Sequence, residues 1–109
     1  MECRYQPLYQ GEEGYVVLCL ECACFQVAFA SILITLVDYD FHAFCRFIET
    51  RHKTCPANQS GNGKSIAIET PAEGICFLLT PQELCSFHEM LEKARDEIKA
   101  LQLIKLFNP

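Results

Sequence analysis

The feature of this sequence that points to specific chemistry is a group of closely spaced cysteines among the eight in the chain. Cys19 and Cys22 form a C-x-x-C pair, and Cys24 extends it to C-x-x-C-x-C. A two-residue gap lets both thiolates reach one tetrahedral ion, so the spacing is typical of zinc sites. Because zinc takes four ligands, the pattern predicts that further donors converge on this cysteine knuckle (Cys19–Cys22).

A third donor is expected from the N-terminal segment. The residues before and after the Gly-Glu-Glu-Gly stretch at 11–14 have strand composition, and the stretch itself is typical of a hairpin turn. If this hairpin is symmetric about its centre, Tyr5 lies opposite Cys19. Cys3 then lies opposite Glu21, beside the knuckle, and its sulfur is the third candidate ligand.

The fourth donor depends on whether residues 25–36 form one strand or two. This apolar segment contains no Gly, Pro, Asn or Asp, which favours one long strand, bent near Ala30-Ser31, over a tight hairpin. The helix that follows then returns to the knuckle and brings Cys55 there as the fourth ligand, with His52 as an alternate. If the chain instead reverses at Ser31, only Cys24 can complete the set.

Two alternatives to a zinc site are open. The first, which we favour from sequence, is that the knuckle and its neighbouring cysteines are reduced structural thiols with no bound cofactor. Cys45, Cys76 and Cys85 lie in or beside apolar positions and are expected to be core filler in any case. The second is a redox dithiol, but a reactive C-x-x-C pair normally sits at a helix N-terminus, whereas this one leads from strand to strand. The sequence has no phosphate-binding Gly loop, H-E-x-x-H or G-x-S-x-G motif, so we expect a non-enzymatic protein.

Composition argues against several classes of function. Lys and Arg number 9 against 14 Asp and Glu, a net charge of −5, and nucleic-acid binding needs basic residues to neutralise phosphates. The first residues lack the basic and apolar regions of a secretory signal, so we expect a cytoplasmic protein with reduced thiols. The apolar run at 23–37 has 15 residues, fewer than the roughly 20 of a membrane-spanning helix, so no membrane contact is expected.

The remaining patterns predict an α+β fold, with two helices on one face of an antiparallel sheet of about five strands. Pro7 places its strand at a sheet edge or in a bulge. A first helix is expected with Asp38 as its N-cap, and two short strands follow at 65–69 and 75–79. The second helix starts with a capping box, Thr80-Pro81-Gln82-Glu83.

We expect a single domain over residues 1–109, made of an N-terminal hairpin with the knuckle (1–24), a strand–helix unit (25–53) and a strand–strand–helix unit (64–109). Residues 32–49 align without gaps on residues 75–92, which indicates a degenerate strand–helix duplication. Further back, Val27-Ala28-Phe29 resembles Ile66-Ala67-Ile68 if four residues are inserted for the second turn. A shared apolar pattern in two unrelated units is the alternative.

The end of the second helix is apolar on all sides, which is difficult to bury within one small domain. Exposed apolar surface on a small protein usually marks an interface. We therefore expect a homodimer, or contact with an unknown protein partner, through the apolar residues Leu101, Leu103, Ile104, Leu106 and Phe107.

The knuckle and the strand after it also carry a family resemblance. Cys19-x-x-Cys22, followed by Gln26-Val27-Ala28-Phe29, an Ile/Leu/Thr strand and a helix, resembles short uncharacterised proteins of Bacteroidetes-type bacteria. That family has no assigned function, so the resemblance implies a bacterial, cytoplasmic protein and assigns no catalytic residue.

Overall fold

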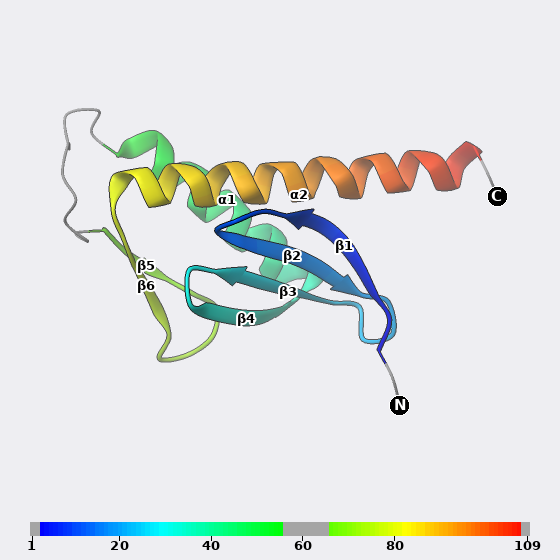
Figure 1. The fold of residues 1–109 in the computed structure, drawn as a ribbon, viewed down its shortest axis with the longest axis horizontal. Helices are drawn as coiled ribbons and strands as arrows, with labels where there is room; N and C mark the ends of the chain where they lie inside the picture. The colour runs from blue at the N-terminus through cyan, green and yellow to red at the C-terminus, as the bar shows by residue number, and fades with distance from the viewer. Residues whose placement is uncertain (1–2, 56–65, 108–109) are drawn as a thin grey trace.

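The computed structural model describes residues 3–55 and 66–107, which form an α+β fold of six strands and two helices (Figure 1). Strands β1–β4 make one antiparallel sheet in chain order, and β5 and β6 make a separate two-stranded sheet. The fold class is therefore as predicted, but the strands form two sheets where one sheet of about five strands was expected. The elements are β1 (Tyr5–Gln10), β2 (Gly14–Cys19), β3 (Cys24–Phe29), β4 (Ile32–Val37), α1 (Asp38–Thr54), β5 (Ile66–Glu69), β6 (Cys76–Leu79) and α2 (Pro81–Phe107).

The β1–β2 hairpin has the predicted register at its open end, where Tyr5 pairs with Cys19. The register shifts between Pro7 and Tyr9, so the proline is accommodated by a bulge in an edge strand, as expected. Gly14 is required at the start of β2 because a Cβ there would lie 1.9 Å from the backbone oxygen of Ala28 on β3.

The prediction of one long strand over residues 25–36 is wrong. The segment forms two strands, with Phe29 paired to Ile32 and only Ala30 and Ser31 between them. Ala30 adopts a φ of 55°, the left-handed conformation that glycine usually supplies at the first central position of such a turn. Its N–H donates to the carbonyl of Glu13 in the neighbouring turn at 3.0 Å, a tertiary contact that supports this conformation.

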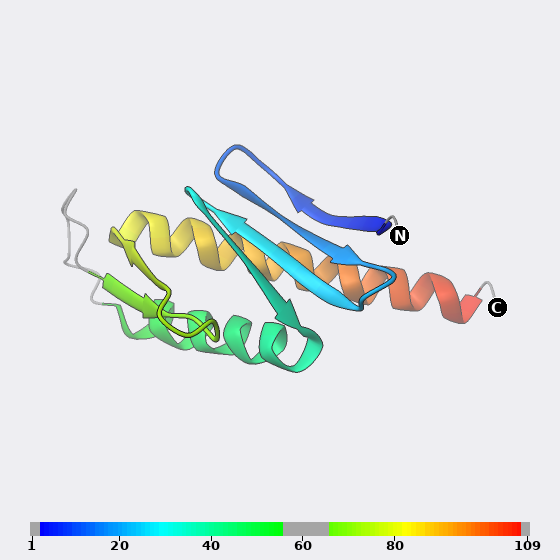
Figure 2. The ribbon, with the colours of Figure 1, turned by 90° about the horizontal axis from the view of Figure 1, so that it is seen from below.

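Both helices pack against the same face of the four-stranded sheet and run antiparallel to each other (Figure 2). Alternate residues of β3 and β4 are buried on this face, whereas the residues between them are half-buried or exposed. Stacked rings join the layers: Phe25 lies 4.1 Å from Phe41 of α1, and Phe29 lies 4.4 Å from Phe87 of α2, measured between ring centroids.

The second half of the chain has the hairpin and the helix start that the sequence predicts. β5 and β6 pair antiparallel, and Ile68 and Phe77 are buried in the same core. The capping box is formed: the Glu83 N–H donates to Thr80 Oγ1 at 3.0 Å, and the Thr80 N–H donates to Glu83 Oε1 at 2.9 Å. Each half therefore contains a β-hairpin followed by a helix, β3–β4–α1 and β5–β6–α2.

Helix α2 has 27 residues and extends past the end of the sheet (Figure 1). In its last turns Leu101 packs against the core, whereas Leu103 and Ile104 are 55% and 54% exposed. The side chains of Leu106 and Phe107 lie outside the described residues. Within residues 3–55 and 66–107, neither helix combines the length and the apolar character needed to cross a membrane.

Candidate metal centre

Cys3, Cys19 and Cys22 come together at one end of the four-stranded sheet. Cys19 ends β2, Cys22 lies in the turn that leads to β3, and Cys3 precedes β1. The three sulfur atoms all lie within 4.8 Å of one another, and the Sγ atoms of Cys3 and Cys22 are 3.7 Å apart. The register of the first hairpin thus brings together the three sulfurs that the sequence nominates, and we call them the cysteine cluster.

The turn at residues 20–23 orients the two knuckle thiols toward one point. The backbone N–H of Cys22 donates to Cys19 Sγ at 3.3 Å, and the N–H of Ala23 donates to the Cys19 carbonyl at 2.9 Å. Ala23 has a φ of 58°, a left-handed conformation that reverses the chain. The pair lies between two strands and not at a helix N-terminus, which favours ligation over a reactive redox dithiol.

Two contacts hold the N-terminal segment, and with it Cys3, against this turn. The N–H of Leu20 donates to the Arg4 carbonyl at 2.8 Å, and Arg4 Nε lies 2.8 Å from Glu21 Oε1. The Arg4 side chain is 76% exposed. The ion pair therefore contributes little to the free energy of unfolding and mainly fixes the position of the N-terminal segment. The role of Arg4 was not predicted, although the register that places Cys3 opposite Glu21 also places Arg4 opposite Leu20.

The distribution of protons in the cluster follows from these hydrogen bonds. The backbone N–H of Cys22 lowers the pKa of Cys19 below its ordinary value. Hydrogen bonds to Cys19 and to Cys3 raise the pKa of Cys22 to about 12. The charge of Cys3 is the main cause that raises the pKa of Tyr5, so this phenol lies within the field of the cluster. Of the two knuckle thiols, Cys19 is therefore the one that ionises more readily.

Three thiolates form a ligand set for a soft or borderline ion such as Zn²⁺, and one that is poorly suited to Mg²⁺ or Ca²⁺, which prefer oxygen. Two sulfur ligands at about 2.3 Å from a tetrahedral ion lie about 3.8 Å from each other. The distance between the sulfurs of Cys3 and Cys22 is 3.7 Å. These two thiols therefore fit two corners of a zinc tetrahedron with little movement.

Cys55 and His52 do not reach the cluster. Because β3 and β4 form a hairpin, α1 starts beside the pair Cys24–Val37, at the cluster end of the sheet. Its 17 residues then run to the other end of the sheet (Figure 1). There Cys55 packs against the core, and His52 stacks on His88 of α2 with ring centroids 4.5 Å apart.

Cys24, the other alternate, lies next to the cluster without belonging to it. It is the first residue of β3, is half-buried, and directs its Sγ to the Cys22 carbonyl at 3.5 Å. In the part of the chain that the structure describes, no further His, Cys, Asp or Glu joins the three sulfurs.

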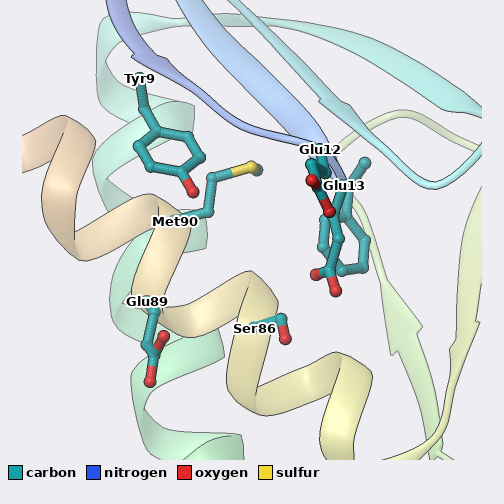
Figure 3. Close-up of a pocket in the computed structure, with 7 residues that line it drawn as sticks. Tyr9, Glu12, Glu13, Ser86, Glu89 and Met90 are labelled. Atoms are coloured by element: carbon teal, nitrogen blue, oxygen red, sulfur yellow. The ribbon is translucent and has the colours of Figure 1, made fainter.

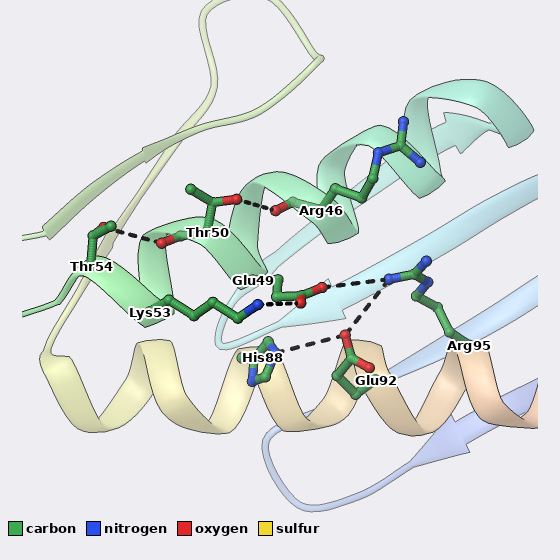
Figure 4. Close-up of polar contacts among 8 residues, drawn as sticks. All are labelled: Arg46, Glu49, Thr50, Lys53, Thr54, His88, Glu92 and Arg95. Carbon is green, nitrogen blue, oxygen red and sulfur yellow. Dashed lines mark hydrogen bonds and ion pairs between the residues drawn. The ribbon is translucent and has the colours of Figure 1, made fainter.

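A polar network between α1 and α2 was not predicted (Figure 4). Glu49 pairs with Lys53 at 2.9 Å on its own helix and faces Arg95 of α2 at 4.0 Å. Glu92 lies 3.6 Å from Arg95 and 3.7 Å from His88. The hydrogen bond and the charge of Lys53 lower the pKa of Glu49. The spacing of charges within each helix is visible in the sequence, but the contact between helices depends on their packing.

A cavity of about 310 Å³ lies between the β1–β2 turn and α2, away from the cluster (Figure 3). Phe29 and Met90 supply apolar surface, and three glutamates give the cavity a negative potential that disfavours anions. Its lining comes from segments distant in sequence, so no local pattern predicts it. The residues that line it are Tyr9, Glu12, Glu13, Phe29, Ser86, Glu89 and Met90.

Comparison with curated proteins and with solved structures found no match. A family model does match, over residues 1–107, and it describes a family of unknown function (DUF6686). Like the proteins that the knuckle resembles, this family has no assigned activity. The match spans nearly the whole chain, and the protein therefore belongs to the DUF6686 family of unknown function.

Proposed function

We propose that this protein binds one zinc ion through Cys3, Cys19 and Cys22. The observation that supports the proposal is the convergence of three sulfurs from two separate segments, all within 4.8 Å of one another. Reduced cysteines that serve as core filler are normally buried. Cys3 and Cys22 are exposed, so burial of apolar surface does not account for their position.

The ion stabilises the fold by joining the N-terminal segment to the β2–β3 turn. β1 is an edge strand, paired on one side only, and Cys3 lies just before it. A metal bridge from Cys3 to Cys19 and Cys22 fixes the end of this strand, in the manner of structural zinc sites.

Metal content tests this proposal. The full chain is incubated with excess zinc, passed through gel filtration and analysed for retained metal. We expect about one zinc per chain, and less than about a tenth of that in Cys22→Ser, because structural zinc survives such separation. Cys76→Ser is the matched control, since Cys76 is also exposed but lies on β6. A wild-type chain without retained zinc, or a Cys22→Ser chain that retains as much, overturns the proposal.

As a second candidate function, we propose that the protein self-associates through the exposed end of α2. Leu103 and Ile104 are more than half exposed on a helix that extends past the sheet (Figure 1). If two copies pair antiparallel and centre on Leu101, Glu97 of one copy lies opposite Lys105 of the other at both ends of the pair. This complementary charge favours a second copy as the occupant.

Light scattering after size exclusion tests self-association. The full chain is expected to have the mass of a dimer, and both a truncation before Leu103 and the full-length Ile104→Glu variant are expected to have the mass of a monomer. A monomeric full chain, or a truncated chain that keeps the dimer mass, overturns this second proposal.

A further inference from the structure

We infer that the cysteine cluster takes its fourth metal ligand from outside the chain, as a thiolate, and therefore exchanges metal with external thiols. This inference rests on the zinc site proposed above and extends it: the site is open to exchange instead of closed and purely structural. Three features of the cluster lead to it.

The first feature is the number of donors. A closed structural zinc site has four protein ligands, whereas a site that exchanges ligands keeps one position free. Among the described residues, only three sulfurs lie within reach of one ion. Cys55 and His52, which the sequence nominated, lie at the far end of α1.

The second feature is the exposure of the cluster. Cys19 is buried, with 3% of its surface accessible, and closes the inner side of the site. Cys3 and Cys22 are both exposed. An ion held by these three sulfurs therefore lies at the protein surface, where its remaining position is open to solvent.

The third feature is the position of Cys24. Its thiol points to the Cys22 carbonyl at 3.5 Å, and its backbone pairs with Val37 at the start of β3. Moving this sulfur onto the ion would break the hydrogen bond and reorient a residue held in the sheet. Cys24, the cysteine beside the cluster, is therefore not oriented to act as the fourth ligand.

The external ligand is a thiolate because an ion already bound by three sulfurs favours a fourth soft donor. On binding, the incoming thiol gives its proton to solvent and its sulfur displaces the solvent molecule at the open position. Transfer follows when further external thiolates replace the three protein cysteines in turn, and each released cysteine takes up a proton. Ligands and protons exchange, and no electron is transferred.

Cobalt(II) in place of zinc reports the number of thiolate ligands through its absorption spectrum. The full chain is titrated with Co²⁺ without oxygen, and 2-mercaptoethanol is then added. We expect one Co²⁺ per chain and, on addition of the thiol, a rise of about a third in thiolate-to-metal absorption as three sulfur ligands become four. Cys24→Ser and Cys76→Ser are expected to respond like the wild type.

Light scattering of the cobalt-loaded protein then distinguishes two sources of thiolate. An unchanged mass together with the thiol response identifies a small external thiol, whereas a metal-dependent doubling that Cys24→Ser or Cys76→Ser abolishes identifies a cysteine of a second copy. Both results support an external ligand.

Two outcomes count against the inference, and they differ. If cobalt binds with the absorption of four thiolates, ignores the added thiol, leaves the mass unchanged and loses one thiolate in Cys24→Ser, then Cys24 of the same chain closes the site. In that case the inference fails while the zinc site stands. If the chain binds no cobalt, both fail.

Discussion

At the scale of single residues, the cysteines occupy different environments that predict different reactivities. Cys45 lies in the core, 1% exposed, and burial raises its pKa to about 12. Cys3 and Cys76 are exposed, the first in the cluster and the second on β6. Because the thiolate is the nucleophile, reactivity follows both access and ionisation.

Alkylation with iodoacetamide at pH 8, followed by peptide mass spectrometry, tests this assignment. We expect Cys3 and Cys76 to react and Cys45 to stay unmodified, since a thiol with a pKa of about 12 is hardly ionised at pH 8. Zinc is expected to slow the alkylation of Cys3 at least about tenfold and to leave Cys76 unchanged. Equal rates at Cys3 with and without zinc would contradict ligation, and labelling in urea confirms that Cys45 reacts once exposed.

At the scale of elements, the β1–β2 hairpin could be predicted from local sequence signals, whereas the β3–β4 hairpin could not. Symmetry about the Gly-Glu-Glu-Gly turn was enough to pair Tyr5 with Cys19 and to bring Cys3 to the knuckle. The β3–β4 turn has no such signal, because Ala30 takes a conformation that glycine normally supplies and depends on a hydrogen bond to Glu13, which is distant in sequence.

The predicted alignment of the two halves nevertheless contained a signal for the missing turn. Val27–Phe29 aligns on Ile66–Ile68 only if four residues are inserted before Ile32 aligns on Ile75. The insertion falls at the turns of two hairpins, β3–β4 and β5–β6. That alignment implies a second strand in the first unit. A second strand reverses the chain before α1, so α1 runs away from the cluster and carries Cys55 to the other end of the sheet.

Two substitutions at the hairpin turns are expected to have opposite effects on stability. Ala30→Gly relieves left-handed strain of about 1–2 kcal/mol and adds unfolded-chain entropy that costs about 0.5–1 kcal/mol, so a net gain in stability of up to about 1.5 kcal/mol is expected. Gly14→Ala places a Cβ 1.9 Å from the Ala28 oxygen and is expected to cost about 2 kcal/mol or more. Urea denaturation measures both, and a stabilising Gly14→Ala would contradict the packing of β2 on β3.

The pair of Glu49 with Lys53 on α1 predicts a pH-dependent contribution to stability. Lys53 lowers the folded-state pKa of Glu49 below the ordinary 4.5. The stabilisation is therefore present above pH 4.5 and is lost as the pH falls through the folded-state value. We expect Lys53→Met to lower Tm slightly at pH 7 and to match the wild type near pH 3. A difference that persists at pH 3 would show that the effect comes from helix propensity and not from the pair.

At the scale of the whole molecule, two layers share one core, but the two ends of the chain are held less firmly. The last turns of α2 extend past the sheet, and the N-terminal segment depends on an edge strand, the Arg4–Glu21 ion pair and the cysteine cluster. If the cluster binds zinc as proposed, the metal bridge is the strongest of these restraints, because metal binding to the folded state adds directly to the free energy of unfolding.

Zinc is therefore expected to raise the thermal stability of the whole domain. At a free zinc concentration about 100 times Kd, binding adds about 2.7 kcal/mol, which for a domain of this size corresponds to a rise in Tm of up to about 10–20 °C. Zinc that binds cysteines of the unfolded chain reduces the rise in Tm. The test is therefore the difference in this rise between Cys76→Ser and Cys22→Ser, and not its absolute size. Cys76→Ser should keep the shift and Cys22→Ser should lose it, with a chelator reversing it in the wild type. An equal rise in Cys22→Ser would mean that zinc acts elsewhere on the molecule, and the bridge between the N-terminal segment and the β2–β3 turn would have to be abandoned.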